Sequence, residues 1–120
     1  FYDNTPYHRI VSGFVIQGGD PTGTGRGGPG YKFNDEPVTR DYNRGIVAMA
    51  NAGANTNGSQ YFVCLQNVGL PKNYTIFGEV TNGMDVVDKI AAVETTMGGD
   101  GAMSKPVDPV IVKTVTITES

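Results

Sequence analysis

Short apolar runs rich in β-branched and aromatic residues recur along the chain, and Gly, Asn or Pro bounds nearly all of them. This pattern is typical of short β-strands joined by turns. Strands are predicted at 9–17, 44–50, 60–65, 74–80 and 110–118. The first carries one Gly, which indicates a bulge or bend, and the last alternates apolar and polar residues in its second half. The pattern favours an antiparallel barrel or sandwich.

The period changes once, between Gly83 and Val93, where apolar residues fall at helical spacing. These residues are Met84, Val87, Ile90 and Ala91. Asn82 precedes the run and is expected to cap it, and Asp85 and Asp88 lie toward the positive end of the helix dipole. One late helix over 83–93 is therefore predicted.

Glycine-rich stretches separate the predicted strands. The densest is 18–30, and others are 51–59 and 97–101. A formal G-x-G-x-x-G pattern begins at Gly23, but Pro29 and Gly30 follow it where a dinucleotide-binding motif needs a helix. We therefore interpret these stretches as loops, and long ordered loops often carry function.

Composition restricts the number of domains, the partners and the kinds of site that the chain is expected to have. The chain has 120 residues and no repeats or linkers, which predicts a single domain over 1–120. Its net charge is −3 and its nine cationic residues are scattered, so neither nucleic acid nor an anionic membrane is an expected partner. One Cys and one His, far apart, predict no disulfide and no metal site. No basic and apolar leader or membrane span is visible, so we expect a cytoplasmic protein.

Four residues indicate a binding groove. Arg9 opens the first strand and Gln17 closes it, while Gln60 opens the strand that carries Phe62. The alternative from the residues alone is that Phe14 and Phe62 belong to an ordinary core and that Arg9 forms a surface ion pair.

The segment 8–20, His-Arg-Ile-Val-Ser-Gly-Phe-Val-Ile-Gln-Gly-Gly-Asp, resembles the signature of the cyclophilin family of peptidyl-prolyl isomerases. Further similar segments follow in the family's order at 23–33, 49–53, 55–62, 77–78 and 83–87. The resemblance runs from Phe1 to the last predicted strand. It implies an eight-stranded antiparallel β-barrel closed by two helices, of which 83–93 would be the second.

Family members carry two strands and a helix before the position of Phe1. The resemblance therefore implies a barrel that is incomplete at its N-terminal side, with exposed strand edges. Three explanations stay open: another chain or a swapped protomer supplies the missing part, a shorter sheet has repacked, or the sequence is incomplete.

The resemblance implies a prolyl cis–trans isomerase that assists protein folding by acting on proline-containing peptides and unfolded proteins without a cofactor. It assigns the catalytic role to Arg9. The implied substrate-binding residues are Phe14, Val15, Gln17, Gly25, Ala50, Asn51, Ala52, Gln60, Phe62, Leu70 and Tyr74. A proline-peptide binding module without turnover and an inactive truncated fragment are the alternatives.

Two positions differ from the commonest eukaryotic pattern. The loop 66–73 is short and has Gly69 where many members carry Trp, and Tyr74 stands where those members carry His. Bacterial-type members share such changes, and the chain resembles them more closely. Because the Trp supplies apolar contact and an indole donor, cyclosporin binding is expected to be weakened.

Overall fold

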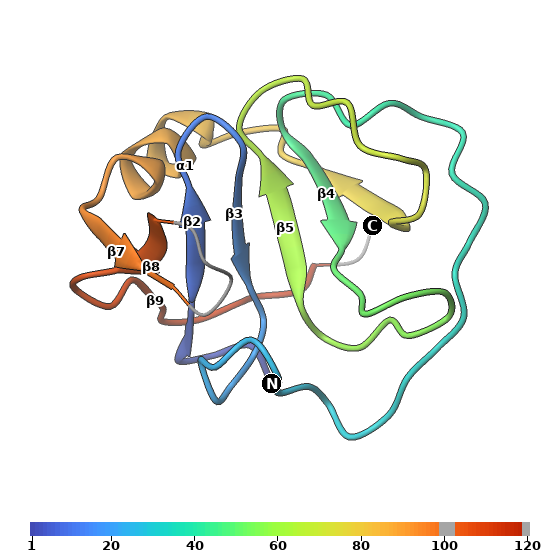
Figure 1. The fold of residues 1–120 in the computed structure, drawn as a ribbon, viewed down its shortest axis with the longest axis horizontal. Helices are drawn as coiled ribbons and strands as arrows, with labels where there is room; N and C mark the ends of the chain where they lie inside the picture. Colours follow the sequence, from blue (N-terminus) through green and yellow to red (C-terminus); the bar gives the residue numbers. More distant parts are fainter. Residues whose placement is uncertain (99–102, 119–120) are drawn as a thin grey trace.

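A five-stranded antiparallel sheet forms the centre of the fold (Figure 1). The structure is a computed structural model that describes residues 1–98 and 103–118. The strand order is β2-β3-β5-β4-β6. These strands are β2 (Arg9–Val11), β3 (Val15–Gly18), β4 (Ile46–Met49), β5 (Tyr61–Cys64) and β6 (Ile76–Glu79). Three of them lie inside the predicted ranges 44–50, 60–65 and 74–80, which confirms those predictions.

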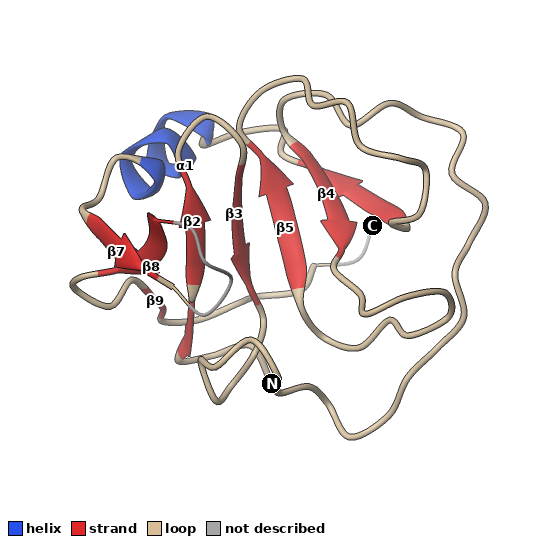
Figure 2. Cartoon of the chain, in the orientation of Figure 1, coloured by secondary structure: helices blue, strands red, loops and turns tan. Residues whose placement is uncertain are grey.

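The remaining elements lie around this sheet (Figure 2). Two further strand pairs and one helix complete the described chain. They are β1 (Thr5–Pro6) with β9 (Ile111–Val112), β7 (Thr95–Met97) with β8 (Met103–Pro106), and α1 (Met84–Ala91). The predicted mainly β fold with one late helix is confirmed. Over the described residues the sheets do not close into a barrel, as the prediction of an incomplete barrel required.

Both faces of the central sheet are apolar. Side chains alternate between the two faces along each strand, and β3 and β5 each have apolar residues at successive positions. On β3, Val15 belongs to the cluster on one face and Ile16 to the cluster on the other. On β5, Phe62 and Val63 divide in the same way. The two faces therefore have separate cores, and the face that carries Phe62 holds the site described below.

Helix α1 packs its Val87, Ile90 and Ala91 against the cluster of Ile16 and Val63. The predicted Asn82 cap is wrong: the residue at the N-cap is Gly83, with φ 94°, and it makes no side-chain hydrogen bond. A glycine adopts this left-handed conformation without the Cβ clash that Asn would face. Within the described ranges, no helix is long and apolar enough to cross a membrane.

The predicted strand 9–17 is two strands, because residues 12–14 form a tight turn between β2 and β3. Gly13 has φ 73° in this turn, and Phe14 donates its N–H to the carbonyl of Val11 at 3.0 Å. Phe14 continues the apolar pattern through the turn, so the sequence does not reveal the break between β2 and β3. The bend that the glycine predicted is thus a complete reversal of the chain.

The predicted strand 110–118 is also shorter than expected. Only Ile111 and Val112 are in a strand, where they pair with β1, and 113–118 is irregular. Alternating Thr, Val and Ile favour a strand only when a neighbour supplies the ladder of hydrogen bonds. The predicted loop 97–101 begins inside β7, and its residues 99–101 lie outside the described residues.

Candidate functional site

The register of the central sheet brings distant residues into one row. Arg9 on β2 pairs with Gln17 on β3, Gln17 pairs with Phe62 on β5, and Phe62 pairs with Ala48 on β4. Residues directly opposite each other in a sheet point to the same face. The sheet therefore places a guanidinium, an amide and an aromatic ring side by side.

A second row continues the site beyond the end of the strands. Ala50 lies two residues after Ala48, and Gln60 lies two residues before Phe62. The N–H of Ala50 donates to the carbonyl of Gln60 at 3.0 Å, which extends the pairing of β4 and β5. The period of two puts these side chains on the same face as the first row.

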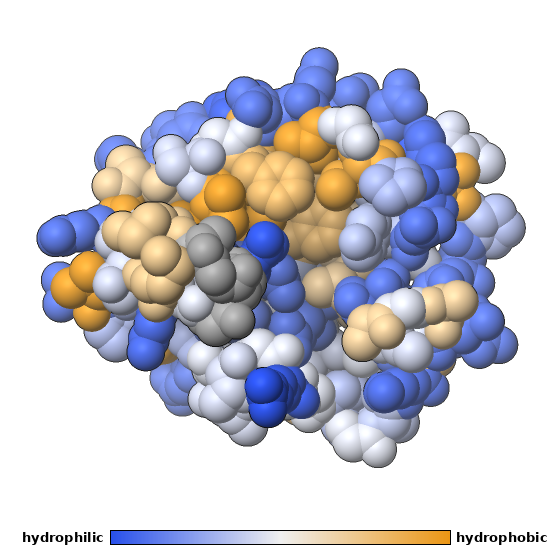
Figure 3. All heavy atoms as spheres, in the orientation of Figure 1, coloured by the Kyte–Doolittle hydropathy of each residue, from blue (hydrophilic) through white to orange (hydrophobic). Residues whose placement is uncertain are grey.

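An apolar pocket of about 210 Å³ opens on this face. Nine of the predicted residues line it: Arg9, Phe14, Val15, Gln17, Ala50, Asn51, Phe62, Leu70 and Tyr74. Its base is part of the core, since Val15 is 2% exposed and Phe62 is 5% exposed. Figure 3 shows apolar side chains gathered over β3 and β5 on one face of the molecule, surrounded by hydrophilic residues. The pocket therefore combines an apolar interior with a polar rim.

Arg9 is held at that rim by its neighbours. Its Nη1 donates to Oε1 of Gln17 at 3.3 Å, and its guanidinium carbon lies 5.9 Å from the centre of the Phe14 ring. Gln17 Nε2 donates to Oε1 of Gln60 at 3.0 Å. Gln60 Nε2 in turn donates to the carbonyls of Gly25 and Gly27, at 2.9 and 3.0 Å. This chain of hydrogen bonds, from the glycine loop through two amides to the guanidinium, fixes which end of each amide faces its neighbour.

The glycine loop 18–30 is folded around the carboxylate of Asp20, which is completely buried. Asp20 Oδ2 accepts from the N–H groups of Gly25 and Gly27, and Oδ1 accepts from the N–H and hydroxyl of Thr22, all at 2.7 to 3.0 Å. Burial alone would raise the pKa of Asp20, but these hydrogen bonds outweigh it and lower the pKa from 3.8 to about 2. A Cβ at Gly27 would lie 1.9 Å from Asp20 Oδ1, so only glycine fits there.

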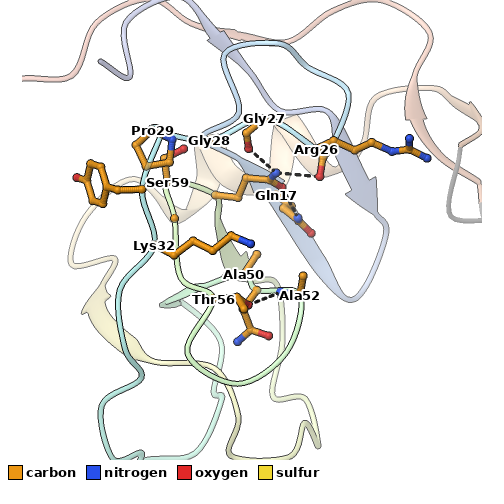
Figure 4. Close-up of a pocket in the computed structure, with 16 residues that line it drawn as sticks. Gln17, Arg26, Gly27, Gly28, Pro29, Lys32, Ala50, Ala52, Thr56 and Ser59 are labelled. Atoms are coloured by element: carbon orange, nitrogen blue, oxygen red, sulfur yellow. Dashed lines mark hydrogen bonds between the residues drawn. The ribbon is translucent and has the colours of Figure 1, made fainter.

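A larger groove of about 540 Å³ adjoins the apolar pocket, and Gln17, Ala50 and Asn51 line both. We call it the glycine-loop groove. It is bounded by residues 25–32, 50–52, 56 and 58–60 (Figure 4). The remaining predicted residues, Gly25, Ala52 and Gln60, line this groove. All twelve predicted site residues thus lie on two adjoining cavities of one face.

The residues of the site that were not predicted include Asp20, Lys32 and Tyr42. Asp20 lies inside the motif of residues 8–20, and a carboxylate that precedes a run of glycines is a signal for backbone hydrogen bonding. Lys32 lines the groove, and Tyr42 supports the pocket from behind. Nothing in the sequence distinguishes Lys32 from the other exposed lysines.

Tyr42 fixes one wall of the apolar pocket. It is 1% exposed, and its hydroxyl donates to the carbonyl of Tyr74 at 2.7 Å and accepts from the N–H of Tyr74 at 3.0 Å. Both backbone groups of Tyr74 are therefore satisfied by one side chain from a distant loop. The rings of Tyr42, Phe62 and Tyr74 pack with centroids 5.6 to 6.4 Å apart.

Replacing Tyr42 with phenylalanine is expected to destabilise the fold by about 1–3 kcal/mol, because it leaves two backbone groups of Tyr74 without a partner. Thermal unfolding should show a midpoint lower by several degrees. Tyr74→Phe removes a hydroxyl at the pocket and keeps the two backbone bonds, so it serves as the matched control with a small expected shift. Equal midpoints for Tyr42→Phe and the parent chain would refute this role.

The titratable groups near the sheet favour non-covalent chemistry at this site. Cys64 is fully buried beneath the pocket, and burial raises the pKa of its thiol to about 11. Burial is also the main reason that the pKa of His8 is lowered. The Cys64 thiol is thus protonated near pH 7, and burial disfavours the charged form of His8. No group of three or more His, Cys, Asp and Glu side chains with the geometry of a metal site occurs among the described residues.

The chain is similar to known proteins of one family. The sequence model of the family "Cyclophilin type peptidyl-prolyl cis-trans isomerase/CLD" matches residues 1–117. The chain is 49% identical over 123 residues to a probable peptidyl-prolyl cis-trans isomerase A of Mycobacterium leprae, covering 98% of this chain and 65% of that protein. A peptidyl-prolyl cis-trans isomerase A of Mycobacterium tuberculosis is 48% identical with the same coverage.

A solved structure has the same fold. It is a cyclophilin type peptidyl-prolyl cis-trans isomerase of Cryptosporidium parvum, determined in the presence of the dipeptide Ala-Pro. It superposes with a TM-score of 0.89 at 38% identity, covering 100% of this chain and 78% of that one. The chain spans about 65% of the length of the mycobacterial relatives. The match over 117 residues and these relatives show that this chain belongs to the cyclophilin-type peptidyl-prolyl cis-trans isomerase family.

Proposed function

We propose that the chain catalyses cis–trans isomerisation of X-Pro bonds in peptides and unfolded proteins. The observation that carries this proposal is the Arg9 guanidinium at the rim of the apolar pocket, hydrogen-bonded to Gln17 and beside the Phe14 ring. The pocket suits a proline ring, because its interior is apolar and its polar groups are confined to the rim.

The reaction breaks no covalent bond. Rotation about the peptide bond costs about 18–20 kcal/mol because amide resonance is lost in the twisted state. A catalyst therefore has to bind the twisted amide more tightly than either planar form. In the twisted state the lone pair on the prolyl nitrogen is no longer delocalised, so it can accept a hydrogen bond.

Arg9 supplies the donor for that lone pair. A guanidinium stays charged at all working pH values and presents its N–H groups in a rigid fork. Its bond to Gln17 fixes the fork before substrate binds, so no reorganisation is needed when the lone pair develops. Phe62, Val15 and Leu70 hold the ring in this mechanism. The carbonyl before proline rotates on the open side of the pocket.

Isomerisation of an Ala-Pro peptide, measured by NMR exchange on this chain, tests the proposal. Uncatalysed exchange takes about tens to hundreds of seconds, and we expect substoichiometric protein to accelerate it strongly. The mass in solution, measured on the same sample, shows whether a second copy takes part. Cyclosporin should inhibit only weakly, because the sequence contains no Trp to supply an indole donor. Peptide binding by the folded chain without acceleration would refute catalysis and indicate a binding module.

A further inference from the structure

The glycine-loop groove has a charge that differs from that of the whole chain. Its lining includes two cationic residues, Arg26 and Lys32, and no Asp or Glu. The chain as a whole has a formal net charge of −3. A cationic lining on an acidic protein favours anionic groups at this one place.

The two cations are directed differently. Figure 4 shows the side chain of Lys32 reaching into the groove toward Ala50, whereas the guanidinium of Arg26 extends away from the groove. Ala50 also lines the apolar pocket, so the Lys32 amine points toward the boundary between the two cavities. Of the two cations that line the groove, Lys32 is therefore the one that a peptide in both cavities would meet.

The backbone beside Lys32 is fixed. The next residue, Phe33, forms an isolated β-bridge with Asn57, with N–H to carbonyl distances of 2.9 and 3.2 Å. Asp35, the nearest acidic residue along the chain, accepts hydrogen bonds from the N–H of Asn55 and from the side chain of Asn57, each at 3.0 Å. The bridge thus holds Lys32 over the groove, and the carboxylate of Asp35 is engaged elsewhere.

The rest of the lining matches a short polar side chain. Ala50 and Ala52 leave space, and both N–H groups of the Gln60 amide are already used by the carbonyls of Gly25 and Gly27. Among the lining side chains, Lys32 thus offers a cationic donor directed into this space.

We propose that Lys32 makes the enzyme selective for peptides with an acidic residue at one of the two positions before proline. This inference rests on the proposed function, which puts the proline ring in the apolar pocket and the preceding residues in the glycine-loop groove. The carboxylate of the substrate pairs with the Lys32 amine. An exposed ion pair of this kind changes affinity by about two- to fivefold, so the effect is a preference and not an absolute requirement.

Six peptides test the preference: acetyl-Xaa-Ala-Pro-Phe-amide and acetyl-Ala-Xaa-Pro-Phe-amide, with Glu, Gln or Lys as Xaa. At low salt we expect kcat/KM for Glu to exceed that for Gln by about two- to fivefold at one of the two positions, with Lys lowest. In 0.5 M NaCl the three values should converge, because the pair is screened. Equal values for Glu and Gln at both positions at low salt would overturn the proposal.

Variants assign the effect to one residue. Lys32→Gln should remove the preference for Glu, and Lys32→Glu should reverse it in favour of Lys. Arg26→Gln removes the same charge from the groove lining and is the matched control that should keep the preference. An equal loss in Lys32→Gln and Arg26→Gln would overturn the assignment to Lys32.

Affinity for the same peptides, from NMR titration, separates this inference from the proposed function. A Glu preference in binding that Lys32→Gln removes supports the inference even if no peptide is turned over. Turnover without any preference refutes the inference and leaves the isomerase function standing.

Discussion

Replacing Arg9 with alanine is expected to lower kcat for X-Pro isomerisation by about a hundredfold to a thousandfold while peptide affinity stays nearly unchanged. This magnitude is typical for the loss of one donor that acts mainly on the transition state. The planar ground-state amide offers no lone pair on nitrogen, so the guanidinium gains its partner only as the bond twists. Phe62 and Leu70, which we propose bind the ring, remain, and we expect them to determine most of the affinity. Saturation kinetics by NMR exchange separate the two parameters.

Two further variants make the Arg9 test specific. Arg9→Lys keeps the charge but loses the rigid fork, so we expect an intermediate rate. Arg40→Ala removes an exposed arginine that pairs with Glu79 on the surface, and it should leave both parameters unchanged. A rise in KM with constant kcat in Arg9→Ala would show that Arg9 only binds the peptide. Unfolding curves for each variant check that the fold is intact.

Much of the sheet could be predicted because its strands are apolar runs that can be recognised in the local sequence. Short apolar runs rich in β-branched and aromatic residues, bounded by Gly, Asn or Pro, gave the positions of β4, β5 and β6 within a few residues. The strands β1, β7 and β8 have no such run. Thr5 and Pro6 form a strand only because Val112 and Ile111 lie opposite them, more than a hundred positions later. Such pairing depends on tertiary structure, which local propensity does not encode.

The site residues on strands could likewise be predicted more readily than those on loops. Arg9, Gln17 and Phe62 lie on strands, so their common face follows from the register. Leu70 and Tyr74 lie on a loop without periodicity, and only the family resemblance pointed to them. Lys32 was missed because its position depends on the bridge between Phe33 and Asn57, which joins two loops. The residues to which we assign the reaction are thus more predictable than the residue that we propose determines selectivity.

Asp20→Asn is expected to destabilise the fold by about 3 kcal/mol near pH 7, because charge-assisted hydrogen bonds are lost and a buried donor is introduced. The carboxylate accepts four hydrogen bonds, from Gly25, Gly27 and Thr22. In the amide one oxygen is replaced by an NH₂ group, which faces other N–H donors. Urea unfolding of the variant and the parent chain measures the difference.

The loss should also depend on pH, with a sign that the lowered pKa determines. Folded Asp20 has a pKa of about 2, against 3.8 as its ordinary value. The unfolded chain therefore takes up this proton first as pH falls, so the stabilisation is fully present above pH 3.8 and is lost as pH falls toward 2. The linked free energy is about 2 kcal/mol. The difference between the parent chain and Asp20→Asn should shrink by this amount between pH 5 and pH 2.

Asp41→Asn is the matched control, because the side chain of Asp41 is 80% exposed and pairs with Lys72 on the surface. It should leave the urea midpoint nearly unchanged. Activity gives a second readout, because Asp20 holds the N–H groups of Gly25 and Gly27 while Gln60 bonds their carbonyls. Asp20→Asn should therefore lower kcat beyond the fraction of chain that is unfolded, through Gln60, Gln17 and Arg9. A stability difference that stays constant across pH would show that the carboxylate does not carry the charge-assisted bonds, and an unchanged kcat would separate the glycine loop from Arg9.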